Sequence, residues 1–127
     1  MVAMREGIVI FAHGSTVASA NEAVLKVTAA AAAAGQFQYV ETAFLEAAPS
    51  LEDAVGRLVE QGVTHVLIIP YFLTLGVHLQ RDLPAMVAKL VSFHQNVYIR
   101  VAPPLDGHPA LTQILLDRAN AETTDWE

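Results

Sequence analysis

The sequence contains no cysteine, and this absence excludes several classes of chemistry. Disulfides, thiolate metal ligands and cysteine nucleophiles are all ruled out, and nothing indicates an oxidising compartment. The apolar run Ile8 to Ala12 near the start is too short for a secretion signal or a membrane span. We therefore expect a cytoplasmic protein that is not inserted in a membrane.

Positive charge is also scarce. The 127 residues include only seven lysines and arginines against 13 acidic residues, and the net charge is −6. Because the basic residues are scattered rather than gathered in a stripe, we do not expect nucleic-acid binding. Charged residues make up 16% of the chain and apolar residues 54%, which is more apolar surface than one small domain readily hides. A partner subunit or an apolar ligand cleft is therefore expected.

Four short apolar runs are predicted to be strands: Ile8 to Ala12, Tyr39 to Leu45, His65 to Pro70 and Val97 to Ala102. Their nearly continuous apolar character is typical of parallel strands that are buried on both faces. The second run alternates more and includes Glu41 and Thr42, as an edge strand does.

Helices are expected in the intervening segments, over Ala18 to Ala34, Ser50 to Gln61, Asp82 to Phe93 and Pro109 to Ala121. Gly35 is the expected stop of the first, and Ser50 with Asp53 can form a capping box at the start of the second. Pro84 is expected in the first turn of the third. Regular alternation of strand and helix predicts one α/β domain over residues 1–127, a parallel four-stranded sheet flanked by helices, with a fraying tail after residue 121.

Three side chains with metal-binding chemistry follow the first three predicted strands. His13 follows the first, Glu46 the second, and His78 lies in the loop after the third. If the first strand lies between the other two, strands ~4.8 Å apart would bring the three side chains within roughly 10 Å. Two imidazoles and a carboxylate suit a first-row divalent ion such as Co²⁺, Fe²⁺, Ni²⁺ or Zn²⁺ and leave coordination positions open.

Each of these residues also has an ordinary structural interpretation. A lone histidine such as His13 is more often a loop or capping residue, with Gly14 making a turn and Ser15 capping the next helix. Glu46 by itself is interpreted as a solvated loop carboxylate, and His78 is interpreted as an ordinary residue of an apolar loop. The metal-site hypothesis therefore depends on their convergence.

Motifs of other active sites are missing. No glycine-rich loop ends in Lys-Ser or Lys-Thr, and no GxGxxG follows the first predicted strand. These absences argue against a phosphate-binding NTPase loop and against dinucleotide binding. Ser15 stands close to His13 but lacks the context of a nucleophile elbow, so serine hydrolysis is a poor fit.

Four segments carry a family resemblance: FAHGST with Asn21 beyond it, AFLEAAPSLEDAV, IIPYFLTLGVHLQRDLP and APPLDGHPALTQILLDR. They cover nearly the whole chain, and in order and spacing they resemble the short sirohydrochlorin chelatases of the CbiX/SirB type. The resemblance implies an α/β half-domain, two of which form the full cleft, so that a short chain works as a homodimer. The excess of apolar residues agrees with this expectation.

The resemblance also implies roles for individual residues. His13 of the HGS segment, Glu46 of the FLE segment and His78 of the GVHxxxDxP segment correspond to the metal ligands. His13 and His78 are the expected catalytic proton acceptors, and Glu46 is a third ligand or proton relay. Thr16 stands where many relatives have an arginine. If that arginine binds a substrate carboxylate, another cationic side chain must do so in this protein. The tetrapyrrole is expected to contact Gly14, Ser15, Tyr71, Phe72, Leu73, Leu75 and Gly76.

The implied reaction is ATP-independent insertion of Co²⁺ into sirohydrochlorin for cobalamin synthesis, with no permanently bound cofactor. Fe²⁺ insertion for sirohaem is the alternative within the family, and Ni²⁺ is a further option, because such a ligand set does not select the metal. A non-catalytic metal or tetrapyrrole carrier is the alternative from another class. The substrate is rich in carboxylates, and Arg81, Lys89 and Arg100 are candidate counter-charges on this acidic protein.

Overall fold

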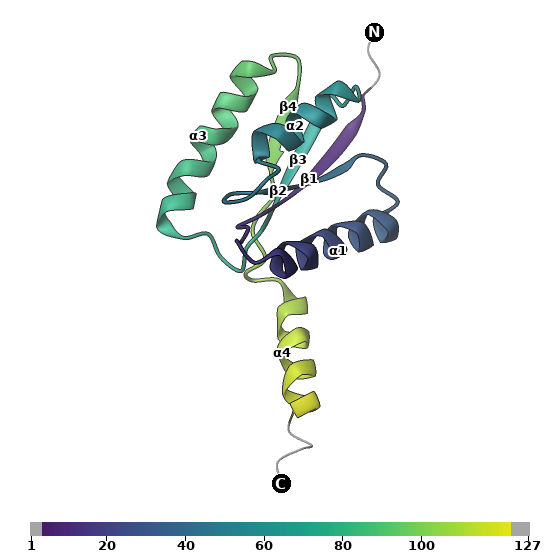
Figure 1. Cartoon of the computed structure of the whole chain (residues 1–127), viewed down its shortest axis with the longest axis vertical. Coiled ribbons are helices and arrows are strands. Elements are labelled where there is room, and N and C mark those ends of the chain that lie inside the picture. Colours follow the sequence, from purple (N-terminus) through teal and green to yellow (C-terminus); the bar gives the residue numbers. More distant parts are fainter. Residues whose placement is uncertain (1–3, 123–127) are drawn as a thin grey trace.

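A four-stranded parallel sheet with strand order β2-β1-β3-β4 organises the fold (Figure 1). The computed structural model describes residues 4–122, and every structural statement below refers to this range. Its elements are β1 (Glu6–Ala12), α1 (Ala18–Gly35), β2 (Val40–Phe44), α2 (Leu51–Glu60), β3 (His65–Tyr71), α3 (Val77–Phe93), β4 (Tyr98–Val101) and α4 (Pro109–Glu122). The predicted fold class is confirmed, including β2 as an edge strand beside β1.

The main core lies on one face of the sheet, beneath α2 and α3. Side chains alternate along a strand, so β1 turns Val9 and Phe11 to this face, and β3 turns Val66 and Ile68. All four are almost completely buried. They meet apolar residues of the two helices, including Leu51, Val55, Leu58, Leu79, Leu83 and Leu90. This packing holds β1 and β3 at the centre of the sheet.

The opposite face of the sheet is covered by α1 on the β2 side. The hydroxyl groups of Thr28 in α1 and Thr42 in β2 are buried and joined by a hydrogen bond of 3.0 Å. Thr28 in turn donates to the Val24 carbonyl within its own helix, so both hydroxyls have partners. Thus α1, whose first turn adjoins the His13 loop, is held to the sheet by a polar contact as well as by packing.

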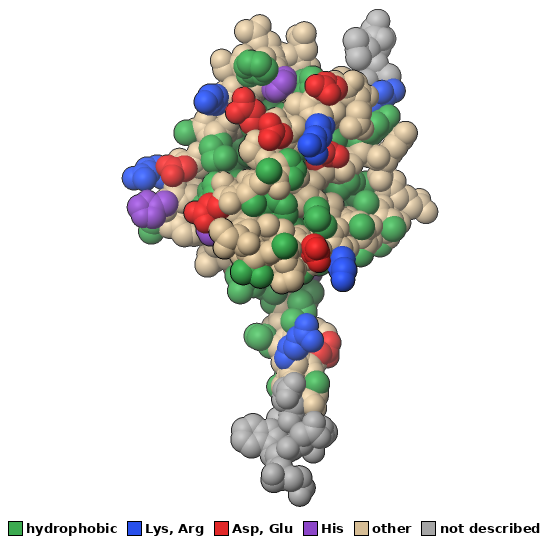
Figure 2. Space-filling model, in the orientation of Figure 1, with side chains coloured by type: hydrophobic (Ala, Val, Ile, Leu, Met, Phe, Trp, Pro, Cys, Tyr) green, Lys and Arg blue, Asp and Glu red, His purple; other side chains and the backbone are tan. Residues whose placement is uncertain are grey.

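The last helix, α4, stands apart from the layers. Figure 1 shows it extending away from the sheet, and Figure 2 shows it as a narrow projection below the body of the protein. No other element packs extensively on it within residues 4–122. None of the described helices is long and apolar enough to cross a membrane.

Several predicted helix boundaries need correction. The first helix continues through Gly35, and Gln36, not the glycine, takes the left-handed conformation that ends it. Ser15 does not cap this helix, whose N-cap is Val17. The third helix begins at Val77 rather than near Asp82, because Pro84 removes only one backbone donor and the helix continues through it.

Other local predictions are confirmed. Ser50 and Asp53 form the predicted capping box, with each side chain accepting from the other residue's backbone N–H. The glycine at position 62 follows α2 with a φ of +86°, as a helix stop requires. The predicted fraying of the tail concerns residues 122–127. Glu122 is the last residue of α4, and residues 123–127 lie outside the described range.

Candidate metal-binding site

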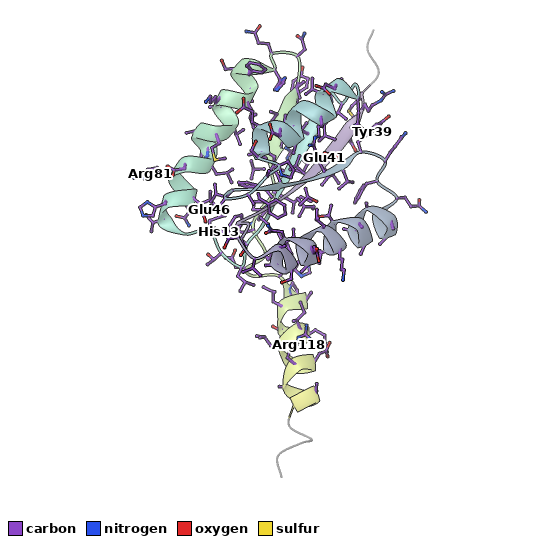
Figure 3. The ribbon with its side chains drawn as sticks, in the orientation of Figure 1. His13, Tyr39, Glu41, Glu46, Arg81 and Arg118 are labelled. Carbon is purple, nitrogen blue, oxygen red and sulfur yellow. The ribbon has the colours of Figure 1, made fainter. Side chains whose placement is uncertain are left out.

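The pairing of β1 with β2 continues past the ends of both strands and positions the two loops that carry His13 and Glu46. The Leu45 N–H donates to the Ala12 carbonyl at 2.9 Å, and the Glu46 N–H donates to the His13 carbonyl at 2.8 Å. These bonds hold the two chain segments side by side at the carboxyl edge of the sheet. Figure 3 shows the side chains of His13 and Glu46 lying next to each other there.

Gly14 makes this close approach possible. Its φ is +85°, a conformation that residues with a Cβ rarely adopt. A Cβ placed here would lie 2.9 Å from the Cβ of Phe44 and 3.1 Å from that of Ala47. The glycine therefore lets the His13 loop turn directly against the Glu46 loop.

Asn21, in the first turn of α1, holds the same loop from the other side. Its Oδ1 accepts from the Ser15 N–H, and its Nδ2 donates to the Ser15 carbonyl, both at 2.9 Å. The Ser15 hydroxyl accepts from the Val17 N–H. The sequence alone does not predict this role of Asn21, and its one signal is an amide side chain in an alanine-rich helix beside the HGS segment.

The hydrogen bonds of His13 fix its tautomer. Its Nδ1 lies 3.1 Å from the carbonyl oxygen of Gly14, which can only accept, so Nδ1 carries the proton. The lone pair of Nε2 then points outward, and it lies 3.6 Å from Oε2 of Glu46. Metal-binding histidines commonly donate their second ring N–H to a backbone carbonyl in this way.

His13 Nε2 and the Glu46 carboxylate are both electron-pair donors, so a cation between them would stabilise the arrangement. A neutral imidazole nitrogen and a carboxylate oxygen repel unless a proton or a metal ion joins them. For bonds of about 2.1 Å, two ligands at a tetrahedral angle are about 3.4 Å apart. The 3.6 Å separation of His13 and Glu46 is close to this value, and both side chains are more than half exposed, at 59% and 64%. The pair can therefore receive an ion directly from solvent.

His78 does not join this pair within one protomer, so the predicted convergence of three side chains is not found. It is the second residue of α3, and its Nδ1 lies 3.4 Å from Nη2 of Arg81. Arginine only donates, so this ring nitrogen accepts the bond. Within residues 4–122 no group of three or more His, Asp or Glu side chains is placed to hold a metal ion. The cause is the early start of α3, which turns position 78 into a helical residue.

The apolar loop after β3 divides into packed and exposed side chains. Phe72 packs edge-on against Phe11 and lies 6.4 Å, centroid to centroid, from the His13 ring. Leu75 packs against the core, whereas Leu73 is 67% exposed. Tyr71 is half-buried at the end of β3. Phe72 thus forms an apolar wall beside His13, and Leu73 is free to meet a ligand.

A match to a family model shows to which family this chain belongs. The model of the CbiX family matches residues 7–122, which is nearly the whole chain. This protein belongs to the CbiX family. The match includes the loops that carry His13 and Glu46 and the first turn of α3 with His78.

Known sirohydrochlorin chelatases are similar over most of this chain. The sirohydrochlorin cobaltochelatase of Methanopyrus kandleri is 29% identical, and the alignment covers 87% of this chain and 92% of that protein. The sirohydrochlorin cobaltochelatase of Priestia megaterium is 32% identical over 88% of this chain but only 37% of its own length. The chloroplastic sirohydrochlorin ferrochelatase of Arabidopsis thaliana is 30% identical over 89% of this chain and 51% of its own. The matched region therefore corresponds to about half or less of these two longer relatives.

Two solved structures share the fold. The crystal structure of a putative cobalamin biosynthesis CbiX protein from Marinobacter aquaeolei is 33% identical with a TM-score of 0.82, covering 94% of this chain and 98% of that one. The chelatase SirB from Bacillus subtilis subspecies spizizenii, solved in complex with cobalt, has a TM-score of 0.87. At 24% identity over 94% of this chain and 51% of SirB, the second likeness shows the fold alone.

The candidate counter-charges of this CbiX-family chain lie in different places. Arg81 is on the same side of α3 as His78 and also contacts Asp82, at 3.2 Å. Lys89 lines a groove between α2 and α3, and Arg100 lies on the opposite face of the sheet. The N–H of Ser15 is already bonded to Asn21, so it is not open to a substrate carboxylate.

Proposed function

We propose that this protein inserts Co²⁺ into sirohydrochlorin without ATP, as a step of cobalamin synthesis. The observation that carries the proposal is the His13–Glu46 pair, with the Nε2 lone pair and a carboxylate oxygen 3.6 Å apart on the carboxyl edge of the sheet. Curated CbiX-type relatives named sirohydrochlorin cobaltochelatase support the choice of reaction and metal. The Arabidopsis ferrochelatase makes Fe²⁺ the alternative metal.

The same pair accounts for the exchange of charge that the reaction requires. Two pyrrole N–H protons must leave the macrocycle when a divalent ion enters it. As the ion passes to the pyrrole nitrogens, His13 Nε2 and the Glu46 carboxylate lose their cation and become free to accept one proton each. Two positive charges leave the pair and two return, so the site avoids a large change in charge. The four new metal–nitrogen bonds drive the step.

We propose His78 as a third ligand that engages after the metal has bound, and as the final acceptor of the second proton, which Glu46 relays to it. In this structure its Nδ1 accepts from Arg81, so the imidazole must rotate away from that guanidinium to approach His13. Arg81 has a largely exposed side chain and would then be free to bind a substrate carboxylate. A metal held by few protein ligands is also easier to hand on.

The macrocycle is proposed to lie against the loop after β3. Leu73 and Val77 are 67% and 79% exposed, and Phe72 is already beside the His13 ring. Gly76 has open space where a Cβ would be, so a flat ligand can approach its backbone. Tyr71, Phe72, Leu73, Leu75 and Gly76, with Gly14 and Ser15, remain the proposed binding set.

A second copy of the chain is proposed to close the cleft, since this chain matches only about half or less of two longer relatives. A homodimer would supply an equivalent carboxyl edge opposite the first. A cytoplasmic location is part of the proposal and is supported by the absence of cysteine.

The test is an anaerobic assay of sirohydrochlorin with Co²⁺ or Fe²⁺, followed by the absorbance change of the macrocycle. We expect insertion well above the spontaneous rate, with Co²⁺ faster than Fe²⁺, and loss of the acceleration in both His13→Ala and His78→Ala. His94→Ala is a matched control, because His94 ends α3 far along the helix from His78. Stoichiometric binding without turnover would favour a carrier, and turnover that is indifferent to both substitutions would refute the site.

A further inference from the structure

The two histidines of the proposed site are held in opposite tautomers. The Gly14 carbonyl accepts the Nδ1 proton of His13 and leaves the Nε2 lone pair of that ring free. At His78 the partner is a donor instead, because Nη2 of Arg81 lies 3.4 Å from Nδ1 and a guanidinium has only N–H groups to offer. The proton of the neutral His78 ring is therefore on Nε2, and its single lone pair, on Nδ1, is engaged by Arg81.

A histidine in this state can perform neither of the tasks proposed for it. Binding a metal ion and accepting a proton both require a free lone pair on the ring. The Nε2 atom of His78 has none, because it carries the proton, and the Nδ1 lone pair accepts from the guanidinium. The contact with Arg81 therefore keeps His78 inactive in the free protein, whereas His13 is ready to bind.

Arg81 is folded back along its own helix. Its Nη2 contacts His78, three residues earlier in α3, and its Nε donates to Oδ1 of Asp82 at 3.2 Å. Figure 3 shows Arg81 at the outer side of α3, apart from His13 and Glu46. The Arg81 side chain is 72% exposed, and contacts between groups this exposed contribute little to stability. The guanidinium can therefore leave both partners at little cost when a better acceptor arrives.

The position of Arg81 makes it the cation best placed to meet the substrate. Of the seven basic side chains, all of which lie within residues 4–122, only Arg81 has a hydrogen bond or ion pair with a residue of the proposed site. A carboxylate binds a guanidinium through two parallel charge-assisted hydrogen bonds, whereas the neutral ring of His78 accepts one. A guanidinium that extends toward a ligand beside His13 must also abandon the folded-back arrangement on α3.

We propose that Arg81 makes the activity of His78 depend on the presence of the substrate. A carboxylate of the tetrapyrrole binds the guanidinium and draws it away from Nδ1 of His78, which is then free to bind the metal or to accept the second proton. Because the coupling is reciprocal, engagement of His78 by the metal favours carboxylate binding at Arg81 to the same extent. This role rests on the proposed function and adds to it a control by the substrate.

A double-mutant cycle on Co²⁺ affinity tests the control of His78 in the absence of substrate. Arg81→Met removes the donors and keeps an unbranched side chain that suits a helix. We expect it to raise Co²⁺ affinity about twofold to fivefold, the range that an exposed contact of this kind supports. In a His78→Ala background the same substitution should change nothing. An equal rise in both backgrounds, or no rise in either, would overturn the proposal.

Lys26→Met is the matched control for charge. It removes one positive charge from an exposed position of α1, and Co²⁺ affinity should stay at the wild-type value. A rise as large as that of Arg81→Met would attribute the effect to net charge and would also overturn the proposal.

Control by the substrate can be observed on the His78 ring itself. Nitrogen NMR distinguishes an imidazole protonated at Nε2 from one protonated at Nδ1, and His78→Ala assigns the signals. Without metal, wild-type His78 should be in the Nε2–H form, and saturating metal-free sirohydrochlorin should convert it to a mixture of both forms. In Arg81→Met the mixture should be present from the start. A His78 signal that does not change while sirohydrochlorin binds the wild type would contradict control by the substrate.

Steady-state kinetics give a second signature. Arg81→Met should raise the KM for sirohydrochlorin several-fold and change kcat less than twofold, because bound substrate already frees His78 in the wild type. Arg81→Lys, which keeps a cation, should recover part of the KM. An unchanged KM in Arg81→Met would exclude the contact with a substrate carboxylate.

His13→Ala separates the role of Arg81 from the proposed function. It should abolish Co²⁺ binding, since His13 and Glu46 form the primary pair. If Co²⁺ binding survives this substitution, the proposed metal site fails, whatever Arg81 does. If binding requires His13 but the cycle shows no coupling between Arg81 and His78, only the role of Arg81 fails.

Discussion

Asn21 holds the backbone of Ser15 by two hydrogen bonds of 2.9 Å, one accepted from its N–H and one donated to its carbonyl. The loop that carries His13 is thereby tied to the first turn of α1. Since α1 is itself joined to β2 through the buried Thr28–Thr42 contact, the loop has support from both the helix and the sheet. Asn21 touches no metal ligand directly and acts by positioning.

Asn21→Ala is expected to lower the affinity for Co²⁺ by roughly tenfold, as loss of a supporting hydrogen bond at a metal site commonly does. Titration calorimetry would measure the change, with circular dichroism to confirm that the fold is retained. Asn96→Ala is the control, because Asn96 is exposed in the loop before β4. An affinity that stays at the wild-type value in Asn21→Ala would exclude the positioning role.

Gly14→Ala is expected to cost about 1–3 kcal/mol of unfolding free energy and to abolish Co²⁺ binding. The reasons are the positive φ and the 2.9 Å approach to the Phe44 Cβ. Gly56→Ala provides the contrast, because a Cβ in this helical position meets nothing within 4 Å and should stabilise α2 by up to about 1 kcal/mol. Urea unfolding of the two variants would measure the opposite signs, and equal stabilities would contradict the strained-turn argument.

Glu46→Gln keeps the shape of the side chain and removes its charge. We expect Co²⁺ affinity to fall at least tenfold, about 1.4 kcal/mol, because an amide oxygen is a far weaker ligand for a divalent ion than a carboxylate. Glu41→Gln is the matched control, since Glu41 is paired with Arg57 at 3.5 Å rather than with His13. If both substitutions had the same effect, net charge rather than the His13–Glu46 pair would explain binding.

Thr16→Arg introduces a cation directly after the HGS segment, where the family resemblance implies an arginine. Thr16 is exposed next to the His13 loop, so the new guanidinium can reach a substrate carboxylate. We expect the KM for sirohydrochlorin to fall several-fold, and the gain to shrink as salt is added, because salt screens exposed charges. Thr16→Gln, which adds length without charge, should leave KM nearly unchanged. A lower KM in both variants would refute the charge argument.

Much of the fold was predictable because its signals are local. Apolar runs predicted the positions of all four strands, and the Ser50–Asp53 pair located the start of α2. The predicted burial on both faces is wrong for β4, which is mostly exposed. The start of α3 was wrong because Asp82 and Pro84 are typical of a first turn, whereas Pro84 is tolerated seven residues into the helix. Burial of Leu79 and Leu83 stabilises the earlier turns despite the missing hydrogen bond.

The candidate site was predictable only in part. Strand order places His13 beside Glu46, and the ends of buried parallel strands were readable in the sequence. Three features could not be predicted: the tautomer of His13, the hydrogen bonds from Asn21 to Ser15, and the contact of His78 with Arg81. Each depends on the direction of side chains in a loop or a first helical turn. Spacing in a sequence does not specify such directions.

By itself, the sequence determined the α/β class, the parallel sheet, the chemistry of the ligands and the excess of apolar surface. These properties follow from residue type and periodicity, which act over a few neighbouring residues. Only the tertiary structure decided that two of the three predicted ligands meet in one protomer and that α4 departs from its own sheet. Both outcomes depend on long-range contacts, the β1–β2 pairing beyond the strand ends and the bond from Leu105 to Phe72, whose partners lie tens of residues apart in the chain.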